Sequence, residues 1–161
     1  NVTITTEHIV YDNKLEPKRN TYFSLIKNES LGTRKLFSLA GPIIDAIVNG
    51  KTLIIDEFDA RLHPLLGKAI IKLFNSDENK KAQLLLASHN SHYINSSSKL
   101  FRRDQIWFCN KEKDQSTTLY PLTDFSPRKG VDNLEKAYLA GRYGALPLVS
   151  NLEYLGGGNG Q

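Results

Sequence analysis

Leu53-Ile54-Ile55-Asp56-Glu57 gives the strongest indication of the fold, because an apolar run ends there in two adjacent carboxylates. The run begins at Thr52 and shows no alternation of polar and apolar residues. Such a run is typical of a strand that is buried on both faces of a parallel sheet. Ligands of open α/β sheets bind at the carboxyl edge of the strands. The stretch therefore predicts an α/β domain with two acidic groups at a ligand-binding edge.

Helical and strand-like segments flank this stretch. Residues 33–48 and 63–74 repeat apolar side chains at spacings of three and four, which predicts two amphipathic helices. Ser30 is a suitable N-cap and Gly50 a suitable stop for the first helix. Residues 83–87 predict a second buried strand, parallel to the first because a helix connects them. The side chains expected to face the core are Leu36, Leu39, Ala40, Ile43, Ile44 and Ile47 in the first helix, and Leu66, Ala69, Ile70 and Leu73 in the second.

The rest of the chain predicts two strand pairs and a helix. One hairpin is expected from strands at 2–10 and 22–26, and another pair from strands at 105–109 and 117–122. Residues 132–140 predict a last helix. We therefore expect one layered α/β domain over residues 1–155, with a mostly parallel sheet and flanking helices, and a flexible Gly-rich tail over 156–161.

Three short segments carry residues suited to phosphate chemistry. Asp56 is suited to hold Mg²⁺ and Glu57 to polarise a water molecule, although a strand can also simply end in acidic residues. Ser30 and Gly32 open a helix, whose first turn offers free N–H groups to an anion, although Ser30 can equally be an ordinary cap. His89 follows the second buried strand and is suited to contact a phosphate or a water, or to play a structural part. A fourth arrangement, a metal site of His63, His89 and His92, lacks a completing ligand.

Composition narrows the class of protein. The chain has 161 residues, a net charge of +4 and one cysteine, Cys109, which is typical of a reducing cytoplasm. It has no run of about 20 apolar residues, so we expect no membrane partner. Basic residues near aromatic ones leave two interpretations, a DNA or RNA surface or solvated loops around core side chains Trp107 and Phe108. The basic residues are Lys99, Arg102, Arg103, Lys111, Lys113, Arg128 and Lys129, and Phe101 lies among them.

The order and spacing of these segments resemble the second half of an ABC-type ATPase head, as in SMC, RecF and OLD-like proteins. In that family a signature turn, a helix, a Walker B strand, a D-loop and a switch histidine follow one another. The resemblance covers residues 27–93. It implies a P-loop NTPase fold and the cofactors ATP and Mg²⁺. By position it assigns Ser30, Gly32 and Thr33 to the signature, Asp56 to the metal, Glu57 to catalysis, Asp59 to the D-loop and His89 to the switch.

Two positions depart from the pattern of that family. Leu31 stands where the first glycine of the signature is usual, and His63 stands where many members have aspartate in the D-loop. One subset of that family resembles the motifs of this chain more closely than the others do. It is the ATPases classed as AAA in bacterial phage-defence and abortive-infection systems, and the motifs are Glu-Ser-x-Gly-Thr-Arg, Asp-Glu-Phe-Asp and Ser-His-Asn. The segment from Gly141 to Pro147 also resembles the ending of those proteins.

The resemblance implies an ATPase whose heads dimerise around ATP and gate a partner effector, often a nuclease. The 161 residues contain no Gly-x-x-x-x-Gly-Lys-Ser/Thr, so we expect the Walker A lobe on preceding sequence or on another chain, and no hydrolysis by this chain alone. Three alternatives stay open: a DNA repair or maintenance ATPase of the SMC/RecF type, a scaffold that binds nucleotide without hydrolysis, and a Toprim-type nuclease. The spacing of Asp56 to Asp59 does not supply the Asp-x-Asp of the last.

Overall fold

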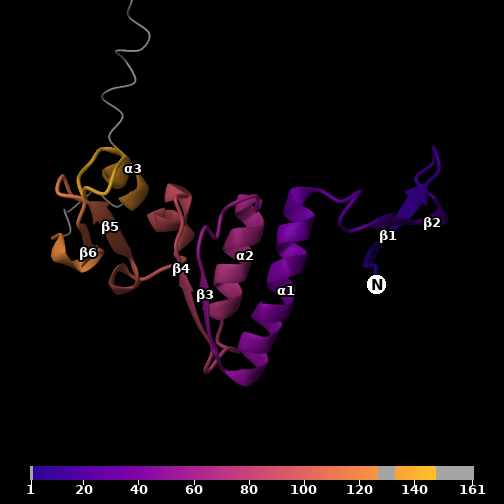
Figure 1. The fold of residues 1–161 in the computed structure, drawn as a ribbon, viewed down its shortest axis with the longest axis horizontal. Helices are drawn as coiled ribbons and strands as arrows, with labels where there is room; N and C mark the ends of the chain where they lie inside the picture. The colour runs from indigo at the N-terminus through magenta and orange to yellow at the C-terminus, as the bar shows by residue number, and fades with distance from the viewer. Residues whose placement is uncertain (1, 127–132, 148–161) are drawn as a thin grey trace, which may run out of the picture. The chain divides into compact units, whose positions relative to one another are not determined.

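The computed structural model describes residues 2–126 and 133–147, in two compact units that span residues 1–89 and 90–161 (Figure 1). The expected tail at 156–161 lies outside the described residues. Within the described residues, no helix has both the length and the apolar character that crossing a membrane requires. The N-terminal unit contains β1 (Thr5–Tyr11), β2 (Pro17–Ser24), α1 (Leu31–Asn49), β3 (Thr52–Ile55), α2 (Pro64–Phe74) and β4 (Gln83–Leu86). The C-terminal unit contains the short 3₁₀ helices η1 (Ser91–Ile94), η2 (Ser96–Ser98), η3 (Arg103–Gln105) and η4 (Leu122–Asp124), strands β5 (Trp107–Lys111) and β6 (Thr117–Pro121), and helix α3 (Leu134–Leu139).

The chain begins with the predicted hairpin. β1 and β2 pair antiparallel, which confirms the prediction, but β2 begins at Pro17 and takes in the polar residues before Tyr22. The carboxylate of Asp12 accepts the backbone N–H groups of Lys14 and Glu16 over 2.8 and 3.0 Å and so holds the turn. The backbone ladder thus extends β2 over residues whose side chains alone indicated a loop.

Helix α1 has the ends that the sequence predicts. Ser30 caps its first turn, and Gly50 ends it in the left-handed conformation with φ 65°. A β-carbon on Gly50 would lie 2.8 Å from the side chain of Lys81, so this position also has no room for one. The buried side chains are Leu39, Ile43 and Ala46. The expected core positions Leu36 and Ile44 are exposed instead, because the covered face of α1 is narrower than its apolar stripe.

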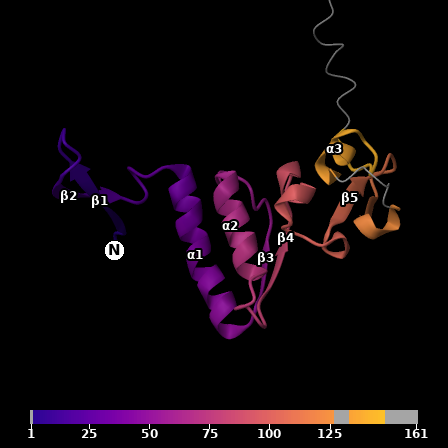
Figure 2. The same ribbon diagram turned by 180° about the vertical axis from the view of Figure 1, so that it is seen from behind.

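Strands β3 and β4 form the predicted parallel pair, with Ile54 opposite Leu85. Helix α1 contacts β3 and helix α2 contacts β4, and Figures 1 and 2 both draw the two helices beside the strands. The expectation that these strands are buried on both faces is wrong for the described residues, since Ile54 is 69% exposed and Leu85 is 60% exposed. Among the described elements, helices pack on one face of this pair, so only the side chains of that face become buried.

The buried face of α2 also differs from the predicted one. The helix begins at Pro64, within one residue of the predicted range of 63–74, and Ile70 is buried, but Leu66, Ala69 and Leu73 are exposed. The buried residues are Gly67, Ile70, Ile71 and Phe74. Apart from Lys68 and Lys72, every residue of this helix is apolar, so the sequence pattern fits two neighbouring faces and packing selects one.

The C-terminal unit is built around the antiparallel pair of β5 and β6, which confirms the second predicted strand pair (Figure 1). Phe108 lies in its core as expected, whereas Trp107 is 54% exposed, because adjacent residues of a strand point to opposite faces. Helix α3 lies inside the predicted range of 132–140, of which Asp132 is outside the described residues. Gly144, with φ 66°, lies so close to Tyr120 that a β-carbon would stand 2.9 Å from the tyrosine oxygen.

Candidate active site

The parallel pairing of β3 and β4 continues beyond both strands. The backbone N–H of Ala87 donates to the carbonyl oxygen of Ile55 over 3.0 Å, and the N–H of Phe58 donates to the carbonyl oxygen of Ala87 over 3.0 Å. These two bonds hold the segment that follows β3 beside the segment that follows β4. The residues that the sequence predicts as catalytic therefore come from two neighbouring strand ends.

Asp56 and Glu57 lie at the first of these ends, and both side chains are exposed. Asp56 accepts the backbone N–H of Glu57 at its Oδ1 over 2.9 Å, which orients this carboxylate. Glu57 has φ 47°, a left-handed conformation that non-glycine residues adopt rarely and that is frequent at functional sites. The next residue, Phe58, is fully buried and fixes the turn. Two adjacent exposed carboxylates on a fixed backbone are a donor set that suits Mg²⁺.

The loop after Glu57 connects the two strand ends. Ala60 donates its N–H to the carbonyl oxygen of Glu57 over 3.0 Å, and Leu62 donates to that of Asp59 over 3.1 Å. The Asp59 carboxylate accepts the backbone N–H of His89 at its Oδ1 over 3.3 Å. The predicted D-loop aspartate therefore lies directly beside the predicted switch histidine, although the two are 30 residues apart in sequence.

The predicted signature turn lies against the same loop. The hydroxyl oxygen of Ser30 accepts the N–H of Thr33 over 3.1 Å, and the two hydroxyl oxygens are 2.9 Å apart. A β-carbon on Gly32 would stand 3.0 Å from the carbonyl oxygen of Arg61. Ser30 is thus the cap of α1, as one of the two sequence interpretations held, and Gly32 allows its helix to approach the backbone of the loop after β3.

Glu29 is a residue of this region whose contacts the sequence did not reveal. Its carboxylate accepts hydrogen bonds from the hydroxyl of Thr6 and, over 2.6 Å, from Nε2 of His8. The hydrogen bond from Thr6, followed by that from His8, lowers the pKa of Glu29, and Thr33 contributes less. Its position next to the cap Ser30 was the available signal, but the donors lie on β1, more than 20 residues earlier.

The remaining histidines have separate partners. His63 caps α2, since its Nδ1 accepts the N–H of Leu65 over 3.2 Å, which is the part an aspartate often plays there. His92 instead forms a pair with Glu135, with 2.6 Å between Nδ1 and Oε1. The described residues include no group of three His, Cys, Asp or Glu side chains that could hold a metal ion, so the site of His63, His89 and His92 is not assembled there.

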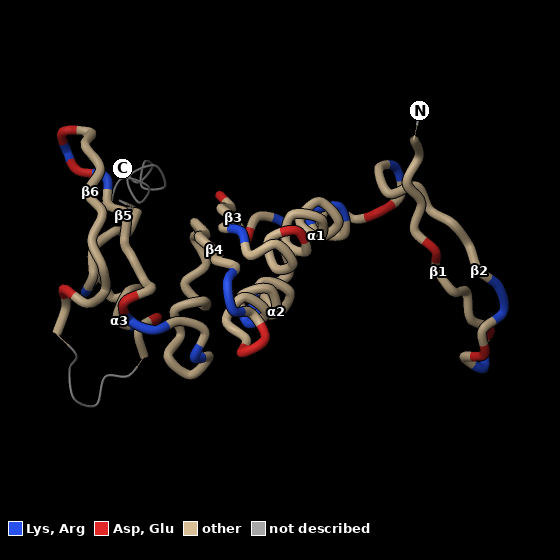
Figure 3. The backbone as a smooth tube through the Cα atoms, turned by 90° about the horizontal axis from the view of Figure 1, so that it is seen from below, with Lys and Arg blue, Asp and Glu red and all other residues tan. Residues whose placement is uncertain are grey.

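The basic residues of the C-terminal unit are partly engaged in structural contacts. Arg102 pairs with Asp104 over 2.7 Å, and Arg103 donates to the carbonyl oxygens of Leu122 and Phe125 over 3.1 and 2.7 Å. Figure 3 shows Lys and Arg segments interspersed with Asp and Glu segments along the tube. Arg128 and Lys129 lie outside the described residues. These contacts favour solvated loops over a continuous basic surface.

Comparison with known families identifies the chain. The family described as "AAA domain, putative AbiEii toxin, Type IV TA system" matches residues 9–95, which is more than half of the chain. The chain belongs to this family. The matched residues of this AAA domain include Ser30, Asp56, Glu57, Asp59 and His89. Neither the curated proteins nor the solved structures contain a significant match to it.

Membership agrees with the expectation of an ATPase of the defence type. AAA domains have the α/β fold of P-loop NTPases, and domains of this kind generally bind ATP with Mg²⁺. The family therefore supports a nucleotide-binding, ATPase-like role in abortive infection. The layered arrangement of α1, α2, β3 and β4 agrees with that fold.

Proposed function

We propose that this AAA domain binds and hydrolyses ATP as part of a head that dimerises, and that its dimerisation gates an effector, a nuclease, in bacterial defence against phage. The observation that supports this proposal most is the meeting of Asp59 and His89 beside Asp56 and Glu57. Two segments that are separate in the sequence, residues 56–59 and the segment with His89, come together at the carboxyl ends of two parallel strands. That edge is the usual ligand site of an open α/β sheet.

The two exposed carboxylates, Asp56 and Glu57, would have different roles. Asp56, whose orientation is set by its bond to the N–H of Glu57, would hold Mg²⁺. Bound there, Mg²⁺ would supply neutralising charge to the phosphates of ATP. Glu57 would accept the proton of the attacking water, and its constrained backbone holds its side chain at the strand end. His89, held through its N–H by Asp59, would contact the γ-phosphate.

Ser30, Gly32 and Thr33 would act on the ATP of a second head. The first turn of α1 offers N–H groups and the positive end of the helix dipole to an anion. Gly32 approaches the carbonyl oxygen of Arg61 so closely that a β-carbon would stand 3.0 Å from it, and this approach would link the turn to the catalytic loop of its own head. Binding of the partner's nucleotide at the turn would thereby alter the positions of Asp59 and His89. Such a link would couple dimerisation to hydrolysis.

A lysine-bearing phosphate loop completes such a site, and the 161 residues contain none. We propose that preceding sequence or a second chain supplies the Walker A lobe. The 161-residue chain alone would then show no steady hydrolysis of ATP, because nothing in it cradles the β- and γ-phosphates.

Mixing two inactive variants tests the composite site. In the full-length protein, Ser30→Arg should block ATP-driven dimerisation but leave ATP binding to the monomer intact, and Glu57→Gln should dimerise but not turn over. A mixed dimer would contain one site with an intact Ser30 facing an intact Glu57. We expect the mixture to regain part of the wild-type turnover, while each variant alone stays inactive.

Dimer mass, nucleotide affinity and turnover are measured on the same samples. The matched control is Ser38→Arg, on the exposed side of the same helix, which should dimerise and hydrolyse ATP as the wild type does. Normal dimerisation of Ser30→Arg, or a mixture of folded variants without activity, would exclude the action of Ser30 on a partner's nucleotide. Ser30 would then be only the cap of α1.

A further inference from the structure

Glu135 is the one buried charged residue among the described parts of the chain, with 8% of its surface exposed. It lies in the first turn of α3, and its carboxylate accepts hydrogen bonds from three residues of one segment. Oε1 accepts from Nδ1 of His92 over 2.6 Å and from the hydroxyl of Ser91 over 3.4 Å, and Oε2 accepts from Nδ2 of Asn95 over 2.7 Å. All of these donors lie in the stretch that follows His89.

The same stretch also accepts a hydrogen bond from the backbone of α3. The hydroxyl oxygen of Ser96 accepts the backbone N–H of Leu134 over 3.1 Å. A buried carboxylate is costly unless donors surround it, and a charged donor lowers that cost further. Among the three side chains that donate to Glu135, His92 is the one that can carry a positive charge. Residues 91–96 are therefore fastened to one end of α3 through a buried charged group.

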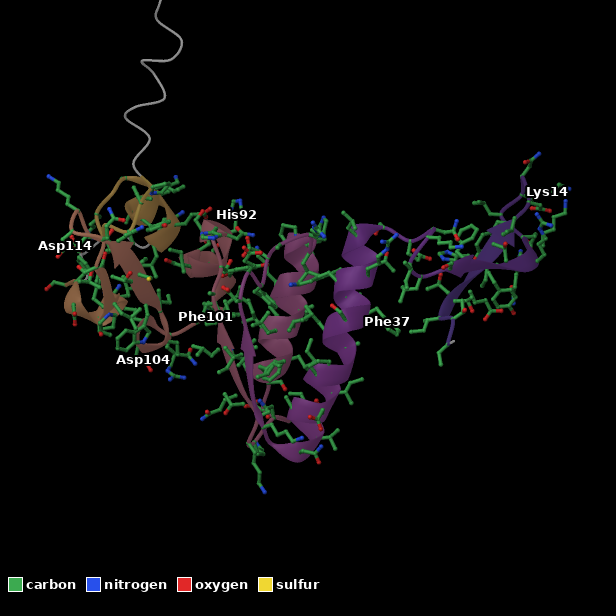
Figure 4. All side chains as sticks on the ribbon, viewed as in Figure 1. Lys14, Phe37, His92, Phe101, Asp104 and Asp114 are labelled. Atoms are coloured by element: carbon green, nitrogen blue, oxygen red, sulfur yellow. The ribbon has the colours of Figure 1, made fainter. Side chains whose placement is uncertain are left out.

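His92 combines this anchored nitrogen with an accessible ring. It is 65% exposed, and Figure 4 shows it on the segment that follows β4. A histidine whose Nδ1 donates to a carboxylate has its tautomer and ring orientation fixed. A neutral side chain in place of Glu135 would hold residues 91–95 with a smaller desolvation cost. The burial of a carboxylate there is therefore better explained by the residues that it positions than by stability alone.

We propose that Glu135 is a positioning residue for His89, acting through the segment of residues 91–95. This inference rests on the proposed function, in which His89 contacts the γ-phosphate. The chain around His89 is held on both sides. The Asp59 carboxylate accepts the backbone N–H of His89, and Glu135 accepts a hydrogen bond from Ser91, two residues later. Loosening the hold of Glu135 lets the backbone after His89 move, and this misplaces the imidazole.

A kinetic double-mutant cycle in the full-length protein tests this proposal. Glu135→Gln keeps the size of the side chain but removes the charge. We expect it to lower kcat for ATP by roughly tenfold, the scale on which loss of an outer-shell partner acts, with little change in KM. In a His89→Ala background the same substitution should lower kcat no further, because its effect passes through His89. A purely structural Glu135 would lower activity additively in both backgrounds.

The matched control is Glu112→Gln in the same unit. The Glu112 carboxylate also accepts two side-chain hydrogen bonds, from Asn110 and Thr118 over 2.9 Å each, but it is exposed and remote in sequence from His89. We expect this variant to keep wild-type kcat. Equal kcat for Glu112→Gln and Glu135→Gln would overturn the proposal.

A second variant covers the case in which Glu135→Gln does not fold. His92→Ala changes a mostly exposed side chain, so the fold should persist, and it should lower kcat in the same non-additive way with His89→Ala. Wild-type kcat for His92→Ala also overturns the proposal. The proposed function fails by a different result: Glu57→Gln and His89→Ala would then both leave turnover unchanged.

Discussion

Oδ1 of Asp59 and the backbone nitrogen of His89 are 3.3 Å apart, and this hydrogen bond joins the loop after β3 to the end of β4. Its acceptor is a side chain and its donor is backbone, so the acceptor can be changed without altering the histidine. In Asp59→Asn the amide keeps an oxygen that can accept this hydrogen bond, whereas in Asp59→Ala the methyl group offers no acceptor.

The first prediction follows from that difference. Asp59→Ala should lower turnover by the full-length protein about tenfold or more, because the His89 backbone loses the acceptor that orients it. Asp59→Asn should retain most of the turnover, since its carbonyl oxygen can still accept the N–H. Steady-state hydrolysis of ATP measures both. Equal losses for the two variants would show that the charge of Asp59, and not this hydrogen bond, is what matters.

The second prediction concerns the close approach of Gly32 to Arg61. Gly32→Ala places a methyl group 3.0 Å from the carbonyl oxygen of Arg61, so the loop after β3 must move by a few tenths of an ångström. Alanine is also favoured over glycine in a helix by about 0.5–1 kcal/mol, which offsets part of the strain in the free energy of unfolding. We therefore expect turnover to fall while thermal stability changes little.

Gly41→Ala is the control for that substitution, because it lies in the same helix and its β-carbon would meet nothing within 4 Å. It should raise the free energy of unfolding by about 0.5–1 kcal/mol and leave turnover unchanged. A loss of turnover in both variants would point to the helix as a whole, and no loss in Gly32→Ala would mean that the loop after β3 tolerates the displacement.

The third prediction separates the two adjacent carboxylates. Glu57→Gln should cut turnover by roughly 10²-fold or more, the usual scale for a lost base, while ATP binding persists. Asp56→Ala should instead weaken the Mg²⁺-dependent part of nucleotide affinity. Both side chains are exposed, so the thermal unfolding of the two variants should stay close to that of the wild type. Unchanged turnover in Glu57→Gln would make Glu57 an ordinary strand-end residue.

The fourth prediction is a dependence of stability on pH through Glu29. The hydrogen bonds from Thr6 and His8 lower its pKa below 4.5, so in the window beneath that value the folded state holds fewer protons than the unfolded state. The stabilisation from Glu29 is complete above pH 4.5 and is lost as the pH falls through the lowered pKa. The difference in unfolding free energy between wild type and Glu29→Gln should therefore shrink in acid.

Thr6→Val provides the matched measurement, because it removes the largest cause of the shift. An NMR titration of the Glu29 carboxyl should show its pKa closer to the ordinary value in this variant than in the wild type. The same titration midpoint in both proteins would contradict the assigned cause.

Most of the local structure could be predicted from the sequence, since it depends on neighbouring residues. Ser30 and Gly50 bound α1 because a cap side chain and a left-handed glycine act within one turn. Pro64 begins α2 for a similar reason. The buried face of α2 could not be predicted, because its apolar residues fit two faces and only contact with its neighbours buries Ile71 and Phe74 rather than Leu66 and Leu73.

The sequence alone indicates the candidates for the proposed chemistry, which are two carboxylates at one strand end, a histidine at the next strand end and a capped helix turn. Membership of the AAA family supports an ATPase-like role for this part of the chain. Which of these residues meet depends on the packing of the strands and helices. Asp59 reaches His89 because β3 and β4 pair in parallel beyond their ends, and His92 joins Glu135 because α3 packs on η1. Such contacts join residues 30 and more positions apart, and no local pattern of side chains encodes them.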